Sequence, residues 1–161
     1  MVRLETRDGR IIRVNLALLE RSLVISEMCR FGQDSEGEDF ILPLHGIHSG
    51  VLLKILLWAE YHKGHEEPAW VAKDGPLPAE EIELQTSDWD KEFLRVEIKN
   101  VYDLMEGSNY LDIRWLYKLC AQKLVFHSNR EPVAQFSKCS KKIPSSIECQ
   151  TVFTEQPFEE Y

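Results

Sequence analysis

Apolar positions near the start of the chain fall into short runs that are typical of β-strands. Val2–Glu5 and Ile11–Val14 form two such runs, and the Asp8-Gly9 pair between them tolerates the positive φ of a tight hairpin turn. Phe40–Leu42 forms a third run, and Pro43 behind it limits its extension and favours the edge of a sheet. This part of the chain therefore predicts a small three-stranded sheet.

Apolar segments with helical spacing lie between and after these runs. Asn15 is a candidate cap for a short helix over residues 16–21, and Leu23–Phe31 continues as a second helical piece. Ser49 is a candidate cap for Val51–Tyr61, which is apolar almost all round. A helix with that pattern is surrounded by other elements, so this segment predicts a central buried helix.

The second half of the chain predicts further helices. Ser87 or Asp88 can cap the first of them, Asn100 can cap the second, and Asp112 the third. The third helix has apolar residues at i, i+3, i+4, i+7 and i+11, namely Ile113, Leu116, Tyr117, Cys120 and Leu124. This stripe predicts the core face of the helix, and Trp115 lies off it.

Two segments carry little periodic signal. The segment 67–87 is rich in proline, glycine and acidic residues, which predicts a flexible, solvated loop between two structured blocks. Residues 128–161 are broken by prolines and predict a largely irregular tail. The chain is accordingly divided into a first structured part (1–66), the loop, a second structured part (88–127) and the tail.

Composition and charge narrow the class of protein. A chain of 161 residues is long enough for one domain with a small appendage. The net charge of −8 and the lack of a basic stripe argue against a nucleic-acid partner. No apolar run is long enough to span a bilayer, and the charged N-terminus lacks the apolar core of a signal peptide. We therefore expect no membrane association and a location in the cytoplasm and nucleus.

Few residues suggest catalytic or metal chemistry. A cluster of histidines in the sequence is formed by His45, His48, His62 and His65. Two of them could share a metal ion, but solvated histidines are the plainer interpretation. No CxxC pair, nucleotide-binding motif or nucleophile elbow occurs. We expect no catalytic residue, no cofactor and no metal, and an enzyme or metal protein using the histidines is the alternative that metal analysis would decide.

Several blocks, taken in order, resemble the S-phase kinase-associated adaptor of SCF ubiquitin ligases. They are VRLETRDGRIIRV, the acidic QDSEGED loop before ILPL, LLKILLWAEYHK, WDKEFLRV and SNYLDIR. Elongin C, a relative, is similar at the hairpin and at NYLD but lacks the WDKEFL block. The resemblance implies an α+β BTB/POZ fold, with a small three-stranded sheet packed with helices and a helical C-terminal extension.

The resemblance also implies a function and its contact residues. It implies a non-catalytic adaptor that bridges a cullin scaffold to an F-box substrate receptor in ubiquitin-dependent protein degradation. On this resemblance, the residues that face the cullin are Asn109, Tyr110, Pro43 and Leu44. Those that face the F-box protein lie on the helix after NYLDI and are Trp115, Leu116, Leu119 and Leu124.

The C-terminal part departs from the family. Trp115 stands where the family carries a glycine, and the tail IPSSIECQTVFTEQPFEEY lacks the family's acidic terminal helices. Trp115 either fills room left by the missing helices or blocks the F-box groove. A second function is therefore open, a BTB module that binds cullin with weak or no F-box binding, as a competitor or inactive paralogue. An apolar face left uncovered around Trp115, Leu119 and Phe126 would favour a homodimer.

Overall fold

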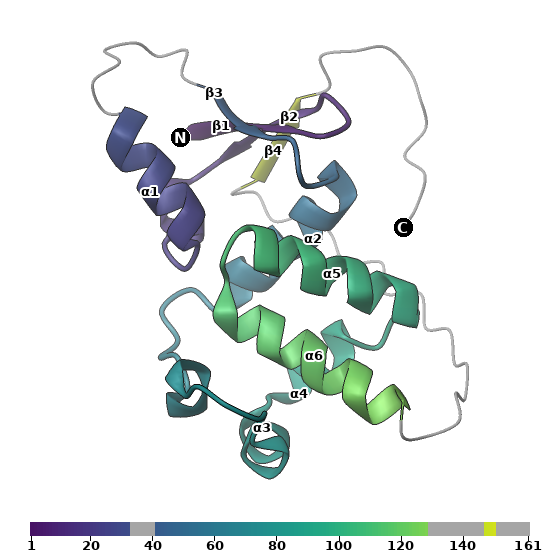
Figure 1. Ribbon diagram of the computed structural model, residues 1–161. Coiled ribbons are helices and arrows are strands. Elements are labelled where there is room, and N and C mark those ends of the chain that lie inside the picture. Colours follow the sequence, from purple (N-terminus) through teal and green to yellow (C-terminus); the bar gives the residue numbers. More distant parts are fainter. Residues whose placement is uncertain (33–40, 129–146, 151–161) are drawn as a thin grey trace.

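A small sheet lies at one end of the fold, and most of the helices lie on one side of it (Figure 1). The computed structural model describes residues 1–32, 41–128 and 147–150. The strand order is β3-β1-β2-β4. The strands are β1 (Val2–Thr6), β2 (Ile11–Val14), β3 (Ile41–Leu44) and β4 (Ile147–Gln150). The predicted α+β class is confirmed, but a fourth strand, β4, lies in the segment that the sequence predicted to be irregular.

The first two strands form the predicted hairpin. β1 and β2 pair antiparallel, and Gly9 in their turn has a φ of 75°, a conformation that glycine adopts without strain. β3 pairs with β1 in parallel, with Pro43 opposite Glu5. Pro43 therefore lies inside the third strand and not behind it, because an edge strand tolerates a residue without an N–H group. The predicted start of that strand, Phe40, lies outside the described residues.

Helices begin directly after the hairpin. The 3₁₀ helix η1 (Leu16–Leu19) is capped by Asn15, as predicted, since its Oδ1 accepts from the Ala17 N–H at 3.0 Å. α1 (Leu23–Gly32) follows η1. α2 (Ser49–Tyr61) is the buried central helix that the sequence predicts.

The cap of α2 differs from the prediction. His48 is the cap, because its Nδ1 accepts from the Gly50 N–H at 3.1 Å. The prediction of Ser49 was wrong, since Ser49 is the first helical residue and donates its hydroxyl to Asp8 Oδ2 at 2.6 Å. This bond joins the hairpin turn to the start of α2.

The segment 67–87 contains two short helices, η2 (Ala69–Ala72) and α3 (Ala79–Gln85). Trp70 is only 1% exposed, and Val71 and Ile82 are equally buried. The prediction of a solvated loop was therefore wrong for these side chains. Lys118 holds the segment in place, because its Nζ donates to the carbonyls of Val71 at 2.6 Å and Lys73 at 2.7 Å.

Three helices complete the fold, α4 (Asp88–Phe93), α5 (Ile98–Tyr110) and α6 (Arg114–Ser128). Ser87 caps α4, as predicted, and accepts from the Asp90 N–H at 3.1 Å. The other two predicted caps were wrong. α5 begins before Asn100, and Asp112 belongs to the turn before α6. Among the described residues, no helix is both long and apolar enough to cross a membrane.

α6 packs beside α5, and its buried face is wider than the sequence predicts (Figure 1). Ile113, Leu116 and Cys120 are buried as expected. Tyr117, predicted to be core, is 37% exposed, whereas Trp115, predicted to lie off the core face, is only 6% exposed. The reason is that α6 is covered on more than one side, because the Trp115 ring contacts Trp58 of α2 and His62 just after it, while η2 and α3 also pack against the helix.

Candidate protein-binding site

The joint between α5 and α6 presents the first two candidate contact residues. The Ile113 N–H donates to the Ser108 carbonyl at 2.8 Å, and the Leu111 N–H donates to the Gly107 carbonyl at 3.0 Å. Asp112 has a φ of 50°, the left-handed conformation that ends many helices. The joint is thereby closed tightly, and Asn109 and Tyr110 are exposed at the end of α5.

A hydrogen bond also ties this joint to the N-terminal half of the chain. The buried Ser22 hydroxyl donates to the Leu111 carbonyl at 2.6 Å. Ser22 lies directly before α1, so the bond links residues that are 89 positions apart. The end of α5 therefore has a fixed position relative to the strands and helices that precede it.

Tyr110 lies against the segment that follows β3. A Cβ built on Gly46 would fall 2.3 Å from Cε2 of the Tyr110 ring, so any side chain at position 46 would require this ring to move. Gly46 comes two residues after the end of β3, and Tyr110 is still 38% exposed. The structure thus brings Tyr110 to the segment that carries Pro43 and Leu44.

Pro43 and Leu44 differ in their access to a partner. The Pro43 side chain is exposed on the edge strand. Leu44 is 0% exposed and belongs to the core, so its side chain offers no surface here, and its assignment to the cullin contact stays a prediction that the burial does not support. Alternate residues of a strand point to opposite faces, which explains why only one of the two neighbours is on the surface.

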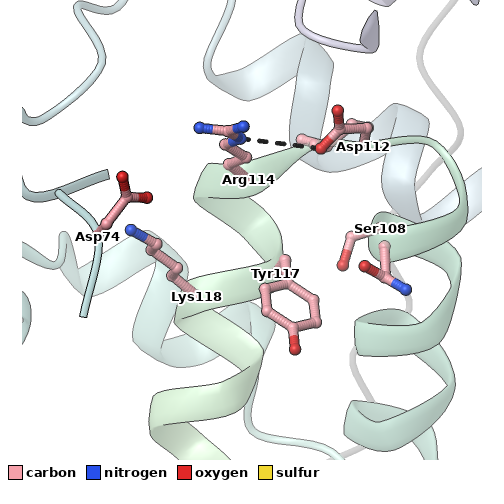
Figure 2. A pocket seen from close by; sticks show the side chains of 8 residues that line it. Asp74, Ser108, Asp112, Arg114, Tyr117 and Lys118 are labelled. Carbon is pink, nitrogen blue, oxygen red and sulfur yellow. Dashed lines mark ion pairs between the residues drawn. The ribbon is translucent and has the colours of Figure 1, made fainter. Parts of the chain in front are cut away.

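A pocket of about 230 Å³ opens beside Asn109. It lies where the α5–α6 joint faces the chain that follows η2, and Figure 2 shows Arg114, Tyr117 and Lys118 reaching it from α6. Arg114 Nε lies 3.9 Å from Asp112 Oδ1, and Lys118 is bound to backbone carbonyls. The charges that line the pocket are thus largely engaged with one another or with the backbone, which makes it a polar hollow in a protein surface.

The predicted F-box-facing residues lie mainly in the core. Trp115, Leu116 and Leu119 are buried, and Leu124 is partly buried against the core. Their assignment to F-box binding stays a prediction, and the burial of the first three counts against it unless the helix rearranges. The described part of α6 presents Tyr117 and Val125 to solvent in their place.

Trp115 fills space beneath α2. Its ring stands edge-on to Trp58, with centroids 5.2 Å apart, and lies 4.3 Å from the His62 ring. The Arg21 guanidinium covers it at 4.9 Å from the ring centroid, a cation–π geometry. Of the two interpretations that the sequence leaves open, these contacts favour filling over blocking.

A buried polar cluster lies beside Trp115, and sequence reasoning missed it. Asp90 Oδ1 accepts from Trp58 Nε1 at 2.9 Å and lies 2.8 Å from His62 Nε2, while Ser87 donates to Oδ2 at 2.9 Å. A carboxylate only accepts, so His62 donates through Nε2. The available signal in the sequence was the pair of blocks YHK and WDKEFL, because the first contains His62 and the second contains Asp90.

Asp90 also determines the environment of His62, to which it is hydrogen-bonded, and affects the pKa of the Cys120 thiol. His62 is buried and serves the fold, and no three His, Cys, Asp or Glu side chains of the described segments are grouped as a metal site. Burial raises the pKa of the Cys120 thiol, and the charge of Asp90 raises it further. Cys120 is therefore held as a neutral thiol and is a poor nucleophile.

Comparison with known proteins matches part of the chain to one family. Residues 1–64 match the model described as "Skp1 family, tetramerisation domain". Proteins named "E3 ubiquitin ligase complex SCF subunit sconC" from Arthroderma benhamiae and Arthroderma otae are each 29% identical to this chain over 115 residues. The matches cover 71% of this chain and 66% of each relative, so they span just under two thirds of the relatives' length.

Proposed function

We propose that this chain, whose residues 1–64 carry the POZ domain of the Skp1 family, is a non-catalytic adaptor subunit of an SCF-type ubiquitin ligase. In this role it binds a cullin scaffold and links it to an F-box protein that recruits the substrate for degradation. The names of the similar proteins support the assignment to such a complex. The expected location is the cytoplasm and nucleus, which imaging of the tagged full chain would test.

One observation carries the scaffold-binding part of the proposal. Tyr110, from the second half of the chain, is exposed while its ring lies on Gly46, from the first half. Asn109 and Pro43 are exposed next to these residues along the chain. Aromatic side chains that are fixed at one face and open at the other are common anchors of protein interfaces. We therefore assign the cullin contact to Asn109, Tyr110 and Pro43.

A binding assay with purified cullin tests this assignment. Wild-type chain should bind at micromolar affinity or tighter. The double variant Asn109→Ala/Tyr110→Ala should lose at least tenfold in affinity and keep its circular dichroism spectrum, and Asn109→Lys should also weaken binding. Tyr102→Ala is the matched control, because Tyr102 is another exposed tyrosine of α5, about two turns away. Lack of cullin binding by folded wild-type chain would refute the proposal.

A second function is favoured by the burial of the α6 side chains. Trp115, Leu116 and Leu119 are enclosed in the domain core, so they offer no surface to an F-box protein without rearrangement. The alternative is therefore a module that binds cullin but has weak or no F-box binding, and so acts as a competitor or is inactive.

A paired assay on the same preparation separates the two functions. Binding of both cullin and an F-box protein at micromolar affinity or tighter supports the complete adaptor. Cullin binding without F-box binding supports the competitor. In both outcomes the measured cullin binding shows that the chain is folded and able to bind a partner. A lack of F-box binding then reflects the chain itself and not a damaged preparation.

A further inference from the structure

The hairpin turn after β1 lies beside the segment that follows β3. In the parallel register of these two strands Thr6 is paired with Leu44, so Arg7 comes next to His45 where the strands end. The Arg7 N–H then donates to the Ile47 carbonyl at 2.8 Å. The hairpin turn is therefore fixed against the segment after β3 by a backbone hydrogen bond.

The segment after β3 packs in turn against the end of α5. A Cβ built on Gly107 would lie 3.1 Å from Cδ1 of Ile47, so the helix and the segment approach each other closely there. Tyr110, about one helical turn further along α5, lies on Gly46. These contacts lead from Arg7 through Ile47 to Tyr110, so the hairpin turn borders the face that we assign to the cullin.

Arg7 brings an unmatched positive charge to this border. Arg7 and His45 are exposed, whereas Thr6 and Leu44 directly before them are buried. The two exposed side chains therefore point away from the core. Within the part of the chain that the structure describes, the Arg7 guanidinium has no ion pair and no hydrogen bond, so all of its N–H donors are available to a partner.

The two acidic residues of the hairpin do not match this charge. The Asp8 carboxylate accepts from the N–H of Ser49 at 3.0 Å and from its hydroxyl at 2.6 Å, and Oδ2 also lies 3.4 Å from Arg10 Nε. Glu5 is on β1, and it forms no ion pair with Arg7 in the described structure. A carboxylate supplied by a partner is therefore the group that suits Arg7, because arginine binds carboxylates through charge-assisted hydrogen bonds.

We propose that Arg7, with His45 beside it, extends the cullin contact across the hairpin turn and binds an acidic side chain of the cullin. This inference rests on the proposed function and adds the chemistry of the partner to it. The chain carries a net charge of −8, so a local positive charge selects where an acidic side chain can dock. Charges at the rim of an interface act mainly on the association rate and on its salt dependence, and they fix the orientation of the partner.

Association kinetics of the full chain with purified cullin test the proposal. Arg7→Glu should lower the association rate constant at least tenfold. Arg7→Gln removes the charge but keeps the backbone bond to Ile47, and it should weaken the salt dependence of the rate. Lys91→Glu is the matched control, because Lys91 is exposed on α4, far from the sheet (Figure 1), and the change in net charge is the same. Its association rate should stay close to that of wild-type chain.

The outcomes separate this inference from the proposed function. If wild-type chain binds the cullin and the two Arg7 variants associate as fast as Lys91→Glu does, the acidic contact is wrong while the adaptor function stands. If folded wild-type chain does not bind the cullin, both are wrong. A charge exchange supplies the last check. Among cullin variants in which single exposed Asp or Glu residues are replaced by Lys, one should restore binding to Arg7→Glu, and restoration by none would overturn the proposal.

Discussion

The ring of Tyr110 lies against Gly46 so closely that a Cβ at position 46 would be 2.3 Å from Tyr110 Cε2. Gly46→Ala should therefore turn the Tyr110 ring outward, since this half-exposed side chain has room to move on its solvent side. We expect a loss of about 1 kcal/mol in the free energy of unfolding. Cullin affinity should fall at least fivefold, as measured by calorimetric titration.

A double-mutant cycle tests the cause of this effect. If the added methyl group acts through Tyr110, then Gly46→Ala should cost little further stability or affinity once Tyr110→Ala is present. Additive losses would show that Gly46 acts independently of Tyr110. Gly64→Ala provides a comparison, because a Cβ at Gly64 meets no atom within 4 Å, although its φ of 80° adds backbone strain.

Asp90 should be among the most sensitive positions of the core. Its side chain is 3% exposed and is contacted by Trp58, His62 and Ser87. Asp90→Ala leaves the Trp58 and His62 N–H groups without an acceptor, and each buried unpaired donor costs about 1–3 kcal/mol. We expect a loss of about 3 kcal/mol or more in the free energy of unfolding, measured by urea denaturation.

The isosteric variant Asp90→Asn supplies the control. The asparagine keeps an acceptor oxygen toward Trp58 and His62, while its amide group can donate to the Ser87 hydroxyl. Its cost should therefore be clearly smaller than that of Asp90→Ala. Equal and small losses in both variants would contradict the role given to the hydrogen bonds.

The stability of the hairpin turn should depend on acid pH through Asp8. Burial by itself would raise the pKa of Asp8, but hydrogen bonds from Ser49 and Thr6 outweigh it and lower the pKa from 3.8 to about 2. Because the folded pKa is below the unfolded one, the unfolded chain takes up the proton first as the pH falls. The contribution of Asp8 is thus complete above about pH 4 and is lost toward pH 2.

Ser49→Ala is the variant that tests this dependence. It removes the 2.6 Å hydroxyl bond to Asp8 and should move the pKa of Asp8 upward, as followed by carboxyl NMR shifts. Denaturation curves between pH 4 and pH 2 should be less steeply dependent on pH for Ser49→Ala than for wild-type chain. The same slope in both proteins would count against the assignment.

The sequence correctly predicted those elements whose stabilising contacts are made between residues close together along the chain. The hairpin needs only two apolar runs and the positive φ of Gly9, and α2 needs only its continuous apolar surface, so both were predicted. Asn15 and Ser87 cap helices through N–H groups two and three residues away. In each case the deciding interaction lies within a few positions.

Predictions failed where the deciding partner is distant. Ser49 looked like a cap, but its hydroxyl is bound to Asp8, 41 residues earlier. Trp70 looked solvated because the lysine that holds its segment, Lys118, lies 48 residues later. On α6 a single stripe was predicted, whereas packing against two sides of the helix buries a second one, Trp115, Leu119 and Gln122. The candidate contacts Asn109, Tyr110 and Pro43 stay predictions that binding assays must test.

Trp115 allows a decisive test between filling and blocking. Its ring contacts Trp58, His62 and Arg21 within the core, so Trp115→Gly removes a large buried side chain and adds a glycine to a helix. Truncation of a buried tryptophan costs about 3–5 kcal/mol, and the glycine adds about 1 kcal/mol. We expect Trp115→Gly to be largely unfolded at 25 °C, as seen in near-ultraviolet circular dichroism. Trp115→Phe keeps a ring in the site, so it should fold with a smaller loss and leave F-box affinity unchanged. A stable Trp115→Gly that gains F-box binding would establish blocking instead.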